Sequence, residues 1–220
     1  ISVSESILVP LRAHTTVAHV VAHGVAPAFA RLAGSNEPWH LPPDGIKVGY
    51  TGNLTREFIA ADIILALARS HPAVSFYFWG DAGNSLEPDD VPNFVRSLKD
   101  LPNCHLRGAH GTSELACEMK EMDAFLLAYR THPTESDLSN SHKILEYLST
   151  GRVVISSPLT EYGAVAQDVI HFVPNNDISD FQIGFSKILS QLERLNSAEL
   201  LLARRNIARA NTYSHHWENI

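Results

Sequence analysis

Lys143 and Glu146 lie three residues apart in the stretch SNSHKILEYLSTGRVVISSP (139–158), and this spacing places both side chains on one face of a helix. A lysine ammonium in the first turn adds a full positive charge to backbone amides that already favour a phosphate group there. A glutamate one turn further along offers two acceptor oxygens, which suit the vicinal hydroxyls of a ribose. The same pair is also typical of an ion pair on a solvated helix face, and spacing alone favours that simpler interpretation.

The residues around this pair predict a helix over 141–150. Ser141 is a suitable N-cap, and Gly151 stands where a helix commonly ends in a glycine. Three apolar residues at helical spacing should form the buried stripe: Ile144, Leu145 and Leu148. The charged pair and Thr150 should then lie on the opposite side of the helix. Because an apolar strand comes before this helix, its first turn should open at the carboxyl edge of a sheet, where ligands bind in doubly wound folds.

Six short runs rich in β-branched or aromatic residues predict the strands of one sheet. They are IKVGYTG (46–52), VSFYFWG (74–80), CHLRG (104–108), DAFLLAY (123–129), RVVISS (152–157) and VIHFV (169–173). Several runs are apolar at consecutive positions, which is typical of strands covered on both faces. Helical patterns over 56–70 and 112–121 lie between them, and 180–213 is helical after the last strand. The sequence therefore predicts the α/β class, with a doubly wound, Rossmann-like, mostly parallel sheet of about six strands and helices on both faces.

The two ends of the chain depart from this alternation. HVVAHGVAPAF (19–29) indicates a short strand followed by a turn at its glycine. Residues 31–45 contain three prolines and two glycines, which indicates a linker. We therefore expect three parts: 1–45 as the end of a missing N-terminal domain plus a connector, 46–213 as one Rossmann-like domain, and 214–220 as the start of a terminal segment.

Composition and charge exclude several classes of protein. The chain has 17 Lys and Arg residues against 24 Asp and Glu residues, a net charge of −7, which argues against nucleic acid as the main partner. Two cysteines are too few for a disulfide framework and fit a reducing, cytoplasmic compartment. No apolar run reaches transmembrane length. The 12 histidines are scattered without metal-ligand spacing, so we expect neither a metal site nor a bound cofactor.

The stretch that carries Lys143 and Glu146 also resembles a known signature. It is similar to the pattern S-P-x-K-x-x-E-Y-x-A-x-G-x-P-V-V of GT-B glycosyltransferases, which use nucleoside diphosphate sugars. Eight residues carry the resemblance: Ser141, Lys143, Glu146, Tyr147, Gly151, Val153, Val154 and Pro158. Other segments resemble the same C-terminal domain, namely 47–54, 77–81 and 101–130, while 1–6 and 20–29 resemble the end of the preceding domain and the connector.

The resemblance implies a site for the donor nucleotide sugar. Its residues would be Gly52, Asn53, His110, Arg130, Ser141, His142, Lys143 and Glu146. Lys143 would contact the diphosphate, and Glu146 would bind the ribose hydroxyls. Gly52 and Asn53 would approach the phosphates at the first turn after a strand, where a missing side chain lets backbone amides come close. His110 would border the base.

Arg130 and the departures from the pattern leave some questions open. Arg130 suits either phosphate neutralisation in place of a metal or a surface ion pair with Glu135. His142 stands where the family has a proline. Leu138 stands where many relatives have a sugar-contacting glutamate, so that contact is absent or is replaced by Asp137 or Glu135. The sequence therefore does not identify the sugar, and the donor is expected to be linked to UDP or GDP.

By this resemblance, the chain would be the donor-binding domain of a hexosyltransferase that transfers a sugar to a glycan or lipid acceptor in polysaccharide biosynthesis. The acceptor and the general base would come from the missing N-terminal domain, so no catalytic residue is assigned within this chain. The chain alone should bind nucleotide but turn over slowly or not at all. Any membrane association would be peripheral, at the cytoplasmic face, and made through that missing half.

Two alternatives remain for the function. A sugar-nucleotide 2-epimerase shares the fold and the ribose-binding glutamate, and product analysis would separate it from a transferase. A non-catalytic interaction module would use the fold for protein contacts, with Lys143 and Glu146 as a simple ion pair. An NAD-dependent Rossmann enzyme is disfavoured, because no G-x-G-x-x-G follows the first predicted strand.

Overall fold

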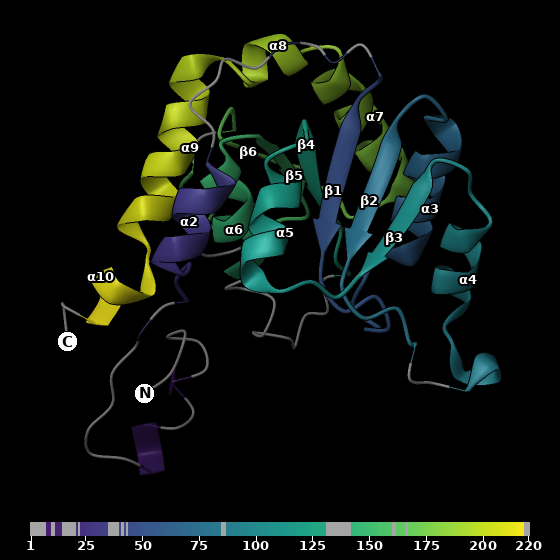
Figure 1. Ribbon diagram of the computed structural model, residues 1–220, viewed down its shortest axis with the longest axis horizontal. Helices are drawn as coiled ribbons and strands as arrows, with labels where there is room; N and C mark the ends of the chain where they lie inside the picture. Colours follow the sequence, from purple (N-terminus) through teal and green to yellow (C-terminus); the bar gives the residue numbers. More distant parts are fainter. Residues whose placement is uncertain are drawn as a thin grey trace.

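The computed structural model of the chain describes residues 8–9, 12–14, 21, 23–34, 40, 42, 44–84, 87–130, 142–159, 162–165 and 167–217. The stretch ISVSES and residues 131–141 lie outside these residues, and the predicted domain bounds stay a prediction. Figure 1 shows one sheet with helices packed against it, which confirms the α/β class.

In the described part of the chain, six strands form one parallel sheet in the order β3-β2-β1-β4-β5-β6. Their bounds are β1 Lys47–Thr51, β2 Ser75–Trp79, β3 Cys104–Gly108, β4 Ala124–Leu127, β5 Val153–Ser156 and β6 Ile170–Phe172. Each strand lies within one of the six predicted runs, so the predicted sheet is confirmed, and it is entirely parallel. The strand order reverses between β1 and β4, and such a reversal leaves a crevice at the carboxyl ends of the strands.

The centre of the sheet is the best-buried part of the fold. All four residues of β4 and all four of β5 are buried. Coverage on both faces explains why these strands are apolar at consecutive positions. The ring of Phe125 on β4 stacks on Tyr147, with ring centroids 4.5 Å apart. This contact fixes the helix that contains Tyr147 against the sheet.

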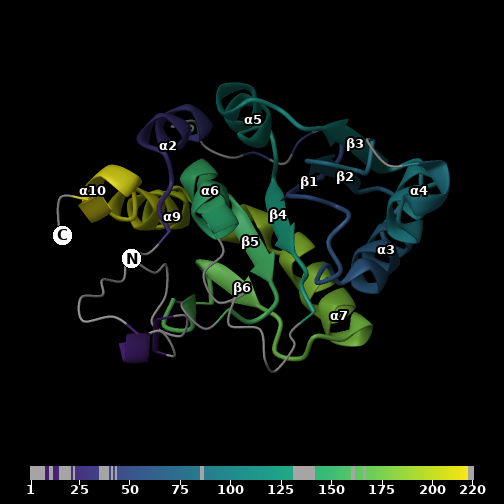
Figure 2. The ribbon, with the colours of Figure 1, turned by 90° about the horizontal axis from the view of Figure 1, so that it is seen from below.

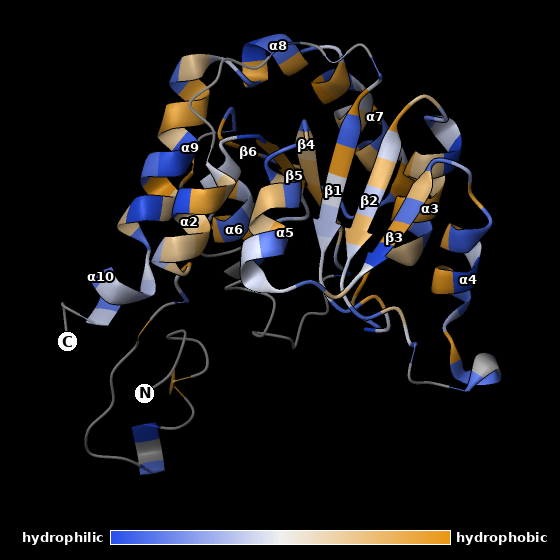
Figure 3. Cartoon of the chain, viewed as in Figure 1, coloured by the Kyte–Doolittle hydropathy of each residue, from blue (hydrophilic) through white to orange (hydrophobic). Residues whose placement is uncertain are grey.

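Helices cover both faces of the sheet, as Figure 2 shows. One face carries α3 (Ala61–Ser70), α4 (Asn93–Lys99) and α7 (Ile178–Leu189), and the other carries α2 (Pro27–Ala33), α5 (Thr112–Met119), α6 (His142–Thr150) and α9 (Ala198–Ala210). The shorter helices are η1 (Arg12–His14), η2 (Pro88–Asp90), α8 (Leu192–Leu195) and α10 (Tyr213–Trp217). In Figure 3, α9 alternates between orange and blue along its length, as expected for a helix with one side packed on the protein. None of the helices in the described ranges is long and apolar enough to cross a membrane.

The segment 19–29 differs from its prediction as a strand and a turn. Val25 forms an isolated parallel bridge with Thr212, and α2 begins two residues later at Pro27. Proline suits the first turn of a helix because it has no N–H group to leave unsatisfied. The helix buries Phe29 and two alanines and packs against α5 and α6. The described part of this segment is therefore a bridge and a helix.

The helix predicted over 56–70 begins later, at Ala61. Ile59 instead pairs with Tyr129 through an isolated antiparallel bridge. The rings of Phe58 and Tyr129 also meet edge to face, with centroids 5.0 Å apart. The loop before α3 is therefore held against the end of β4, at the same edge of the sheet as the first turn of α6.

Candidate functional site

A cavity of about 200 Å³ opens at the carboxyl ends of β1 and β2, beside the reversal of strand order. Its lining consists of Thr51, Gly52, Trp79, Gly80, Ala109, His110, Leu115, Lys143 and Glu146. The sequence predicts four of these residues as donor-binding: Gly52, His110, Lys143 and Glu146. The structure brings these four together, while their binding role stays a prediction.

Two glycines let the ends of β1 and β2 approach the first turn of α6. Gly52 has a φ of +142°, which favours glycine, and a Cβ there would collide with Nζ of Lys143. Gly80 has a φ of +134°, and a Cβ there would collide with the Gly52 carbonyl oxygen. The Gly52 N–H donates to Trp79 O at 2.8 Å, so this amide is already used between the strands. Gly52 therefore contributes space for the lysine and uses its own N–H within the sheet, while its predicted place beside the phosphates stays a prediction.

The Lys143 ammonium lies near the rings of two tyrosines. Its Nζ donates to the Tyr129 hydroxyl at 2.7 Å, and it lies 5.3 Å from the Tyr129 ring centroid and 5.6 Å from that of Tyr50. Burial lowers the pKa of Lys143 to about 8, although the charge of Glu146 acts to raise it. The lysine is therefore a largely desolvated cation near neutral pH, and an anionic ligand would stabilise its charged form.

Glu146 lies one turn along α6 from the lysine. Burial raises the pKa of Glu146 to about 7, and the charge of Lys143 opposes this only in part. Lys143 hydrogen-bonds Tyr129 rather than Glu146. The alternative interpretation, an ion pair on a solvated helix face, is wrong, because Lys143 and Glu146 are half-buried and Thr150 on that side is buried. Lys143 and Glu146 face the cavity at the carboxyl ends of β1 and β2, and α2 and α9 also pack against α6, so this helix is covered on more than one face.

Tyr147 joins α6 to the end of β1. Its hydroxyl accepts a hydrogen bond from the backbone N–H of Thr51 at 2.9 Å and lies 3.3 Å from the Thr51 hydroxyl. Tyr147 is fully buried, and burial raises the pKa of its hydroxyl far above the usual range. Because Thr51 precedes Gly52, this contact sets the position of the lysine over the glycine.

Tyr50 and Tyr129 contact Lys143, although neither is among the predicted donor-binding residues. Both are buried and occur at the ends of apolar runs, where a tyrosine is readily taken for part of the core. One signal was available: both lie near the carboxyl ends of parallel strands, which is the edge where Lys143 is expected.

His110 lies on another wall of the cavity, within a polar group. Its Nε2 is 3.0 Å from Arg107 O, and its Nδ1 is 3.5 Å from Glu114 and 3.6 Å from Glu118. The Glu118 carboxylate also accepts hydrogen bonds from Trp79 Nε1 at 2.6 Å and from Arg107 Nη2 at 3.0 Å. These contacts hold the loop after β3 against α5.

This polar group has one feature that the sequence analysis did not identify. His110, Glu114 and Glu118 each place a potential ligand atom within 4.8 Å of the others, which is close enough to hold a metal ion. Their i, i+4, i+8 spacing was visible in the sequence. The Glu118 carboxylate already bonds Trp79 and Arg107, so its contacts are explained by a structural role. The expectation of no metal site stays a prediction.

Arg130 does not line the cavity. Its Nη2 lies 2.8 Å from Oδ1 of Asp62, near the start of α3, and the two side chains are 51% and 47% exposed. This contact favours the ion-pair interpretation, although the partner is Asp62 instead of Glu135, which lies outside the described residues. An exposed pair of this kind contributes little to stability.

Two of the remaining predicted residues, Asn53 and His142, are next in sequence to the lining residues Gly52 and Lys143. The Asn53 side-chain oxygen accepts hydrogen bonds from the N–H of Thr55 at 2.8 Å and from its hydroxyl at 2.7 Å, so Asn53 stabilises the turn after β1. His142 is the first residue of α6, and Ser141 lies outside the described residues.

The groups that line the cavity can bind and orient an anionic, hydroxyl-bearing ligand. Lys143 supplies a positive charge, and Glu146 supplies acceptor oxygens. Leu115 and Ala109 add an apolar surface of the kind that covers a planar ring. The described lining contains no cysteine or serine nucleophile. The charges of Lys143 and Glu146 therefore suit electrostatic recognition of such a ligand.

This chain is similar in fold to several proteins of known structure. No protein-family model matches the sequence, and no curated protein matches it. The sucrose-phosphate synthase from Thermosynechococcus elongatus is 15% identical, with a TM-score of 0.71 over 99% of this chain and 55% of that chain. HepE from Anabaena, solved in complex with UDP-glucose, is 16% identical, with a TM-score of 0.68 over 99% of this chain and 61% of that chain.

A third similar structure is the UDP-GlcNAc 2-epimerase from Neisseria meningitidis, solved with UDP-GlcNAc bound. It is 15% identical, with a TM-score of 0.51 over 74% of this chain and 44% of that chain. At these identities the likeness concerns the fold, and the chain has a Rossmann-like half of the GT-B fold, as the resemblance implies. The chain spans a little over half the length of the first two proteins.

Proposed function

We propose that this cavity binds a nucleoside diphosphate sugar, and that the chain is the donor-binding half of a glycosyltransferase that acts on a glycan or lipid acceptor. The observation that carries the proposal is the Lys143 ammonium, which lies over Gly52 and bonds a tyrosine hydroxyl instead of a carboxylate. A desolvated cation in this setting gains more from a multiply charged anion than from water. A diphosphate is such an anion.

The lining suggests how the donor would lie. The diphosphate would bind over Gly52 and Gly80, within reach of Lys143 and of the first turn of α6. The ribose hydroxyls would donate to Glu146, and these hydrogen bonds would favour the ionised carboxylate despite its burial. The base would lie against the loop of His110. HepE, which has the same fold, was solved with UDP-glucose, and this supports a uridine nucleotide as the first candidate.

The transfer step would break the bond between the anomeric carbon and the terminal phosphate oxygen, while the acceptor oxygen bonds to that carbon. Negative charge then grows on the departing diphosphate, where Lys143 would stabilise it. The acceptor and its general base would come from a second domain, since the similar glycosyltransferases are much longer than this chain. We place the reaction in the cytoplasm, with any membrane contact made through that second domain.

A second candidate is a sugar-nucleotide 2-epimerase. The likeness to the Neisseria enzyme supports it, because that enzyme was solved with UDP-GlcNAc bound on a similar fold. Both candidates need the same nucleotide contacts, so nucleotide binding does not separate them. Incubation with a UDP-sugar does: an epimerase gives an altered nucleotide sugar without any acceptor. A non-catalytic module differs from both, because it should not bind nucleotide at all.

Calorimetric titration with UDP, GDP and ADP tests the proposed site. We expect one nucleotide to bind, and at a hundredfold excess over its dissociation constant it should stabilise the fold by about 2.7 kcal/mol. Lys143→Ala and Glu146→Ala should each weaken that binding. Lys99→Ala, which removes an exposed lysine from α4, should leave it unchanged. Failure of all three nucleotides to bind, or an equal loss in the Lys99 variant, would contradict the proposal.

A further inference from the structure

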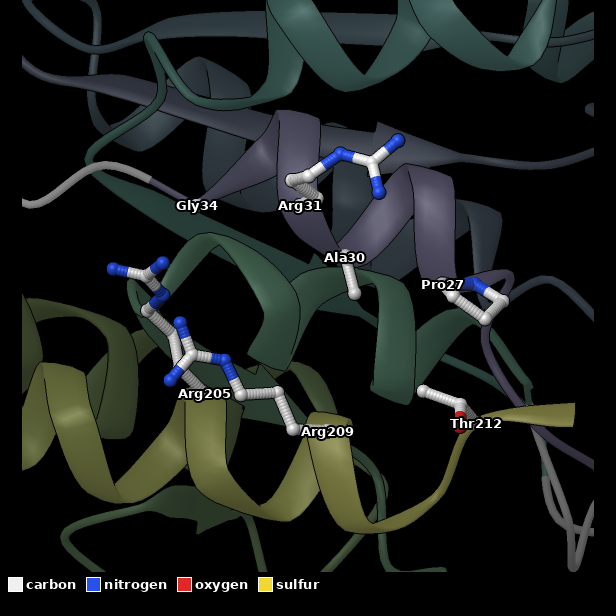
Figure 4. Close-up of a pocket in the computed structure, with 7 residues that line it drawn as sticks. All are labelled: Pro27, Ala30, Arg31, Gly34, Arg205, Arg209 and Thr212. Carbon is white, nitrogen blue, oxygen red and sulfur yellow. The ribbon is translucent and has the colours of Figure 1, made fainter. Parts of the chain in front are cut away.

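Two cavities of the chain are lined by cations, and they differ in how those cations are arranged. The lining of a cavity of about 430 Å³ between α2 and α9 includes Arg31, Arg205 and Arg209. In Figure 4 the Arg31 guanidinium points away from the other two, so these three groups do not converge on one ligand. In the cavity at the carboxyl ends of β1 and β2, which we call the donor cavity, the Lys143 ammonium lies over Gly52. The donor cavity therefore depends on whatever fixes this one lysine.

Arg204 and Lys143 show two ways in which the fold fixes a cation. The Arg204 guanidinium on α9 donates directly to four backbone carbonyl oxygens, at 2.6, 2.6, 2.9 and 3.0 Å. Within the described ranges, Nζ of Lys143 instead hydrogen-bonds one side-chain group, the Tyr129 hydroxyl, at 2.7 Å. A side-chain acceptor fixes a cation only when it is itself fixed. The position of Lys143 therefore depends on that of Tyr129.

Tyr129 lies just beyond the paired part of β4 and β5. The register of these two strands ends at Leu127 and Ser156, and the N–H of Ser157 donates to Leu127 O at 2.9 Å. Tyr129 comes two residues after Leu127 and is buried, so its backbone N–H and C=O need partners within the protein.

Side chains that follow the next two strands supply these partners. The Oγ of Ser157, after β5, accepts from the Tyr129 N–H at 2.9 Å and lies 3.0 Å from Tyr129 O. Asn176 lies in the loop after β6, and its Nδ2 donates to Tyr129 O. The Ser157 hydroxyl also lies 3.2 Å from Oδ1 of Asn176. Because the three residues are connected to one another, we call them the Tyr129 network.

The ring of Tyr129 is fixed together with its backbone. Phe58 meets this ring edge to face, with ring centroids 5.0 Å apart. Ser157 is completely buried, and a buried network with satisfied hydrogen bonds is rigid. With its backbone and ring both held, Tyr129 keeps its hydroxyl beside Nζ of Lys143.

We propose that Ser157 and Asn176 are positioning residues of the donor cavity, which hold Tyr129 so that its hydroxyl keeps the Lys143 ammonium over Gly52. Neither residue belongs to the described lining of the cavity, so each acts through Tyr129. A cation that is already in place stabilises an anion better than one that has to reorganise. The consequence for nucleotide binding rests on the proposed function, whereas the effect on Lys143 does not.

The pKa of Lys143 in the ligand-free 220-residue chain tests the network without any nucleotide. The Tyr129 hydroxyl accepts from the charged form of the lysine, and the charges of Glu146 and Arg56, which also act on it, stay in place. In Ser157→Ala we expect this pKa to fall from about 8 to about 7, as measured by NMR of isotope-labelled lysine side chains.

Ser156→Ala is the matched control for this measurement. It also removes a buried hydroxyl from the end of β5, but that hydroxyl donates to Ser157 O at 2.8 Å, so the pKa of Lys143 should stay unchanged. Asn176→Ala removes the other partner of Tyr129 from a half-buried position and should lower the pKa as Ser157→Ala does. The test therefore does not depend on the folding of one variant. A pKa that is unchanged or raised in both variants, or an equal fall in the control, would overturn the proposal.

Calorimetric titration with UDP, or with GDP or ADP where the parent chain binds one of these instead, connects the network to the ligand. Ser157→Ala should weaken the binding about tenfold. It should add little to the loss caused by Tyr129→Phe, because the hydroxyl through which Ser157 acts is then already absent. Additive losses would overturn the proposal. Failure of the parent chain to bind all three nucleotides would contradict the proposed function, and the pKa of Lys143 would still decide for or against the network.

Discussion

Replacing Glu146 with glutamine should make the ligand-free chain more stable at neutral and alkaline pH. Burial raises the pKa of Glu146 from its ordinary value of 4.5 to about 7 in the folded chain. Below pH 4.5 the carboxyl is protonated in both states, so its burial then carries no cost of ionisation. Between pH 4.5 and about 7 the unfolded chain releases its proton first, so the free energy of unfolding falls as pH rises.

The size of this effect follows from the shift. A shift from 4.5 to about 7 corresponds to a loss of on the order of 3 kcal/mol above pH 7. The substitution also removes the charge that acts to raise the pKa of Lys143, and this offsets part of the gain. We therefore expect Glu146→Gln to add about 2 kcal/mol near pH 8 and almost nothing at low pH. The variant should also bind nucleotide less tightly, because an amide offers one uncharged acceptor oxygen to the two hydroxyls where a carboxylate offers two charged ones.

Urea unfolding of the two proteins across this pH range measures the difference directly. Glu57→Gln is the matched control, since Glu57 is exposed and its substitution should leave the pH dependence of the parent chain unchanged. A stability difference that is constant with pH would refute the reasoning, because it would mean that ionisation of Glu146 is not the cause. Loss of stability near pH 8 would refute it as well.

Three further predictions concern the same edge of the sheet. Gly52→Ala should lower the free energy of unfolding by about 1–3 kcal/mol and weaken nucleotide binding, because the φ of this residue is unsuited to alanine and the added Cβ meets Lys143. Thermal unfolding and calorimetric titration measure the two effects, and parent-like values in both would contradict this prediction. Tyr147→Phe should lower the free energy of unfolding, measured in urea, by about 1–3 kcal/mol, because the buried Thr51 N–H loses its acceptor. Unchanged stability would show that the hydroxyl is dispensable. Nucleotide affinity should fall as pH rises through about 8, where Lys143 loses its charge, and calorimetry on Lys143→Ala should show no such fall.

The sheet could be predicted from the sequence, but not all of the helices that pack against it could. Strands such as β4 are buried on both faces, so their apolar residues run consecutively and stand out from the helices. Helix α2 is short and begins at Pro27 within a stretch that also contains Gly24 and Gly34. Its stability comes from packing Phe29 against the rest of the fold, and local sequence carries little information about that packing.

The sequence could predict which residues meet at the site, but it could not predict how deeply they are buried. Lys143 and Gly52 meet because both lie at the carboxyl edge of a parallel sheet, which follows from the alternation of strands and helices. The burial of Thr150 does not follow, because helical spacing reveals one buried face of α6 and says nothing of the second face that α2 and α9 cover. Arg130 bonds Asp62 across 68 residues of sequence, and no local pattern pairs two such residues.

The buried Arg204 guanidinium on α9 donates to four backbone carbonyl oxygens, which belong to Gly151, Asp168, Val169 and Leu195. These four hydrogen bonds determine how the native chain can open. They connect α9 with the turn after α6, the loop before β6 and the end of α8. Fraying of α9 from one end soon reaches this residue, and further opening would break all four bonds and strip a buried charge of its acceptors. The slowest-exchanging amides of β5, β6 and α9 should therefore exchange with deuterium at one common rate. The carboxyl-terminal part of the fold would then open as a single cooperative unit.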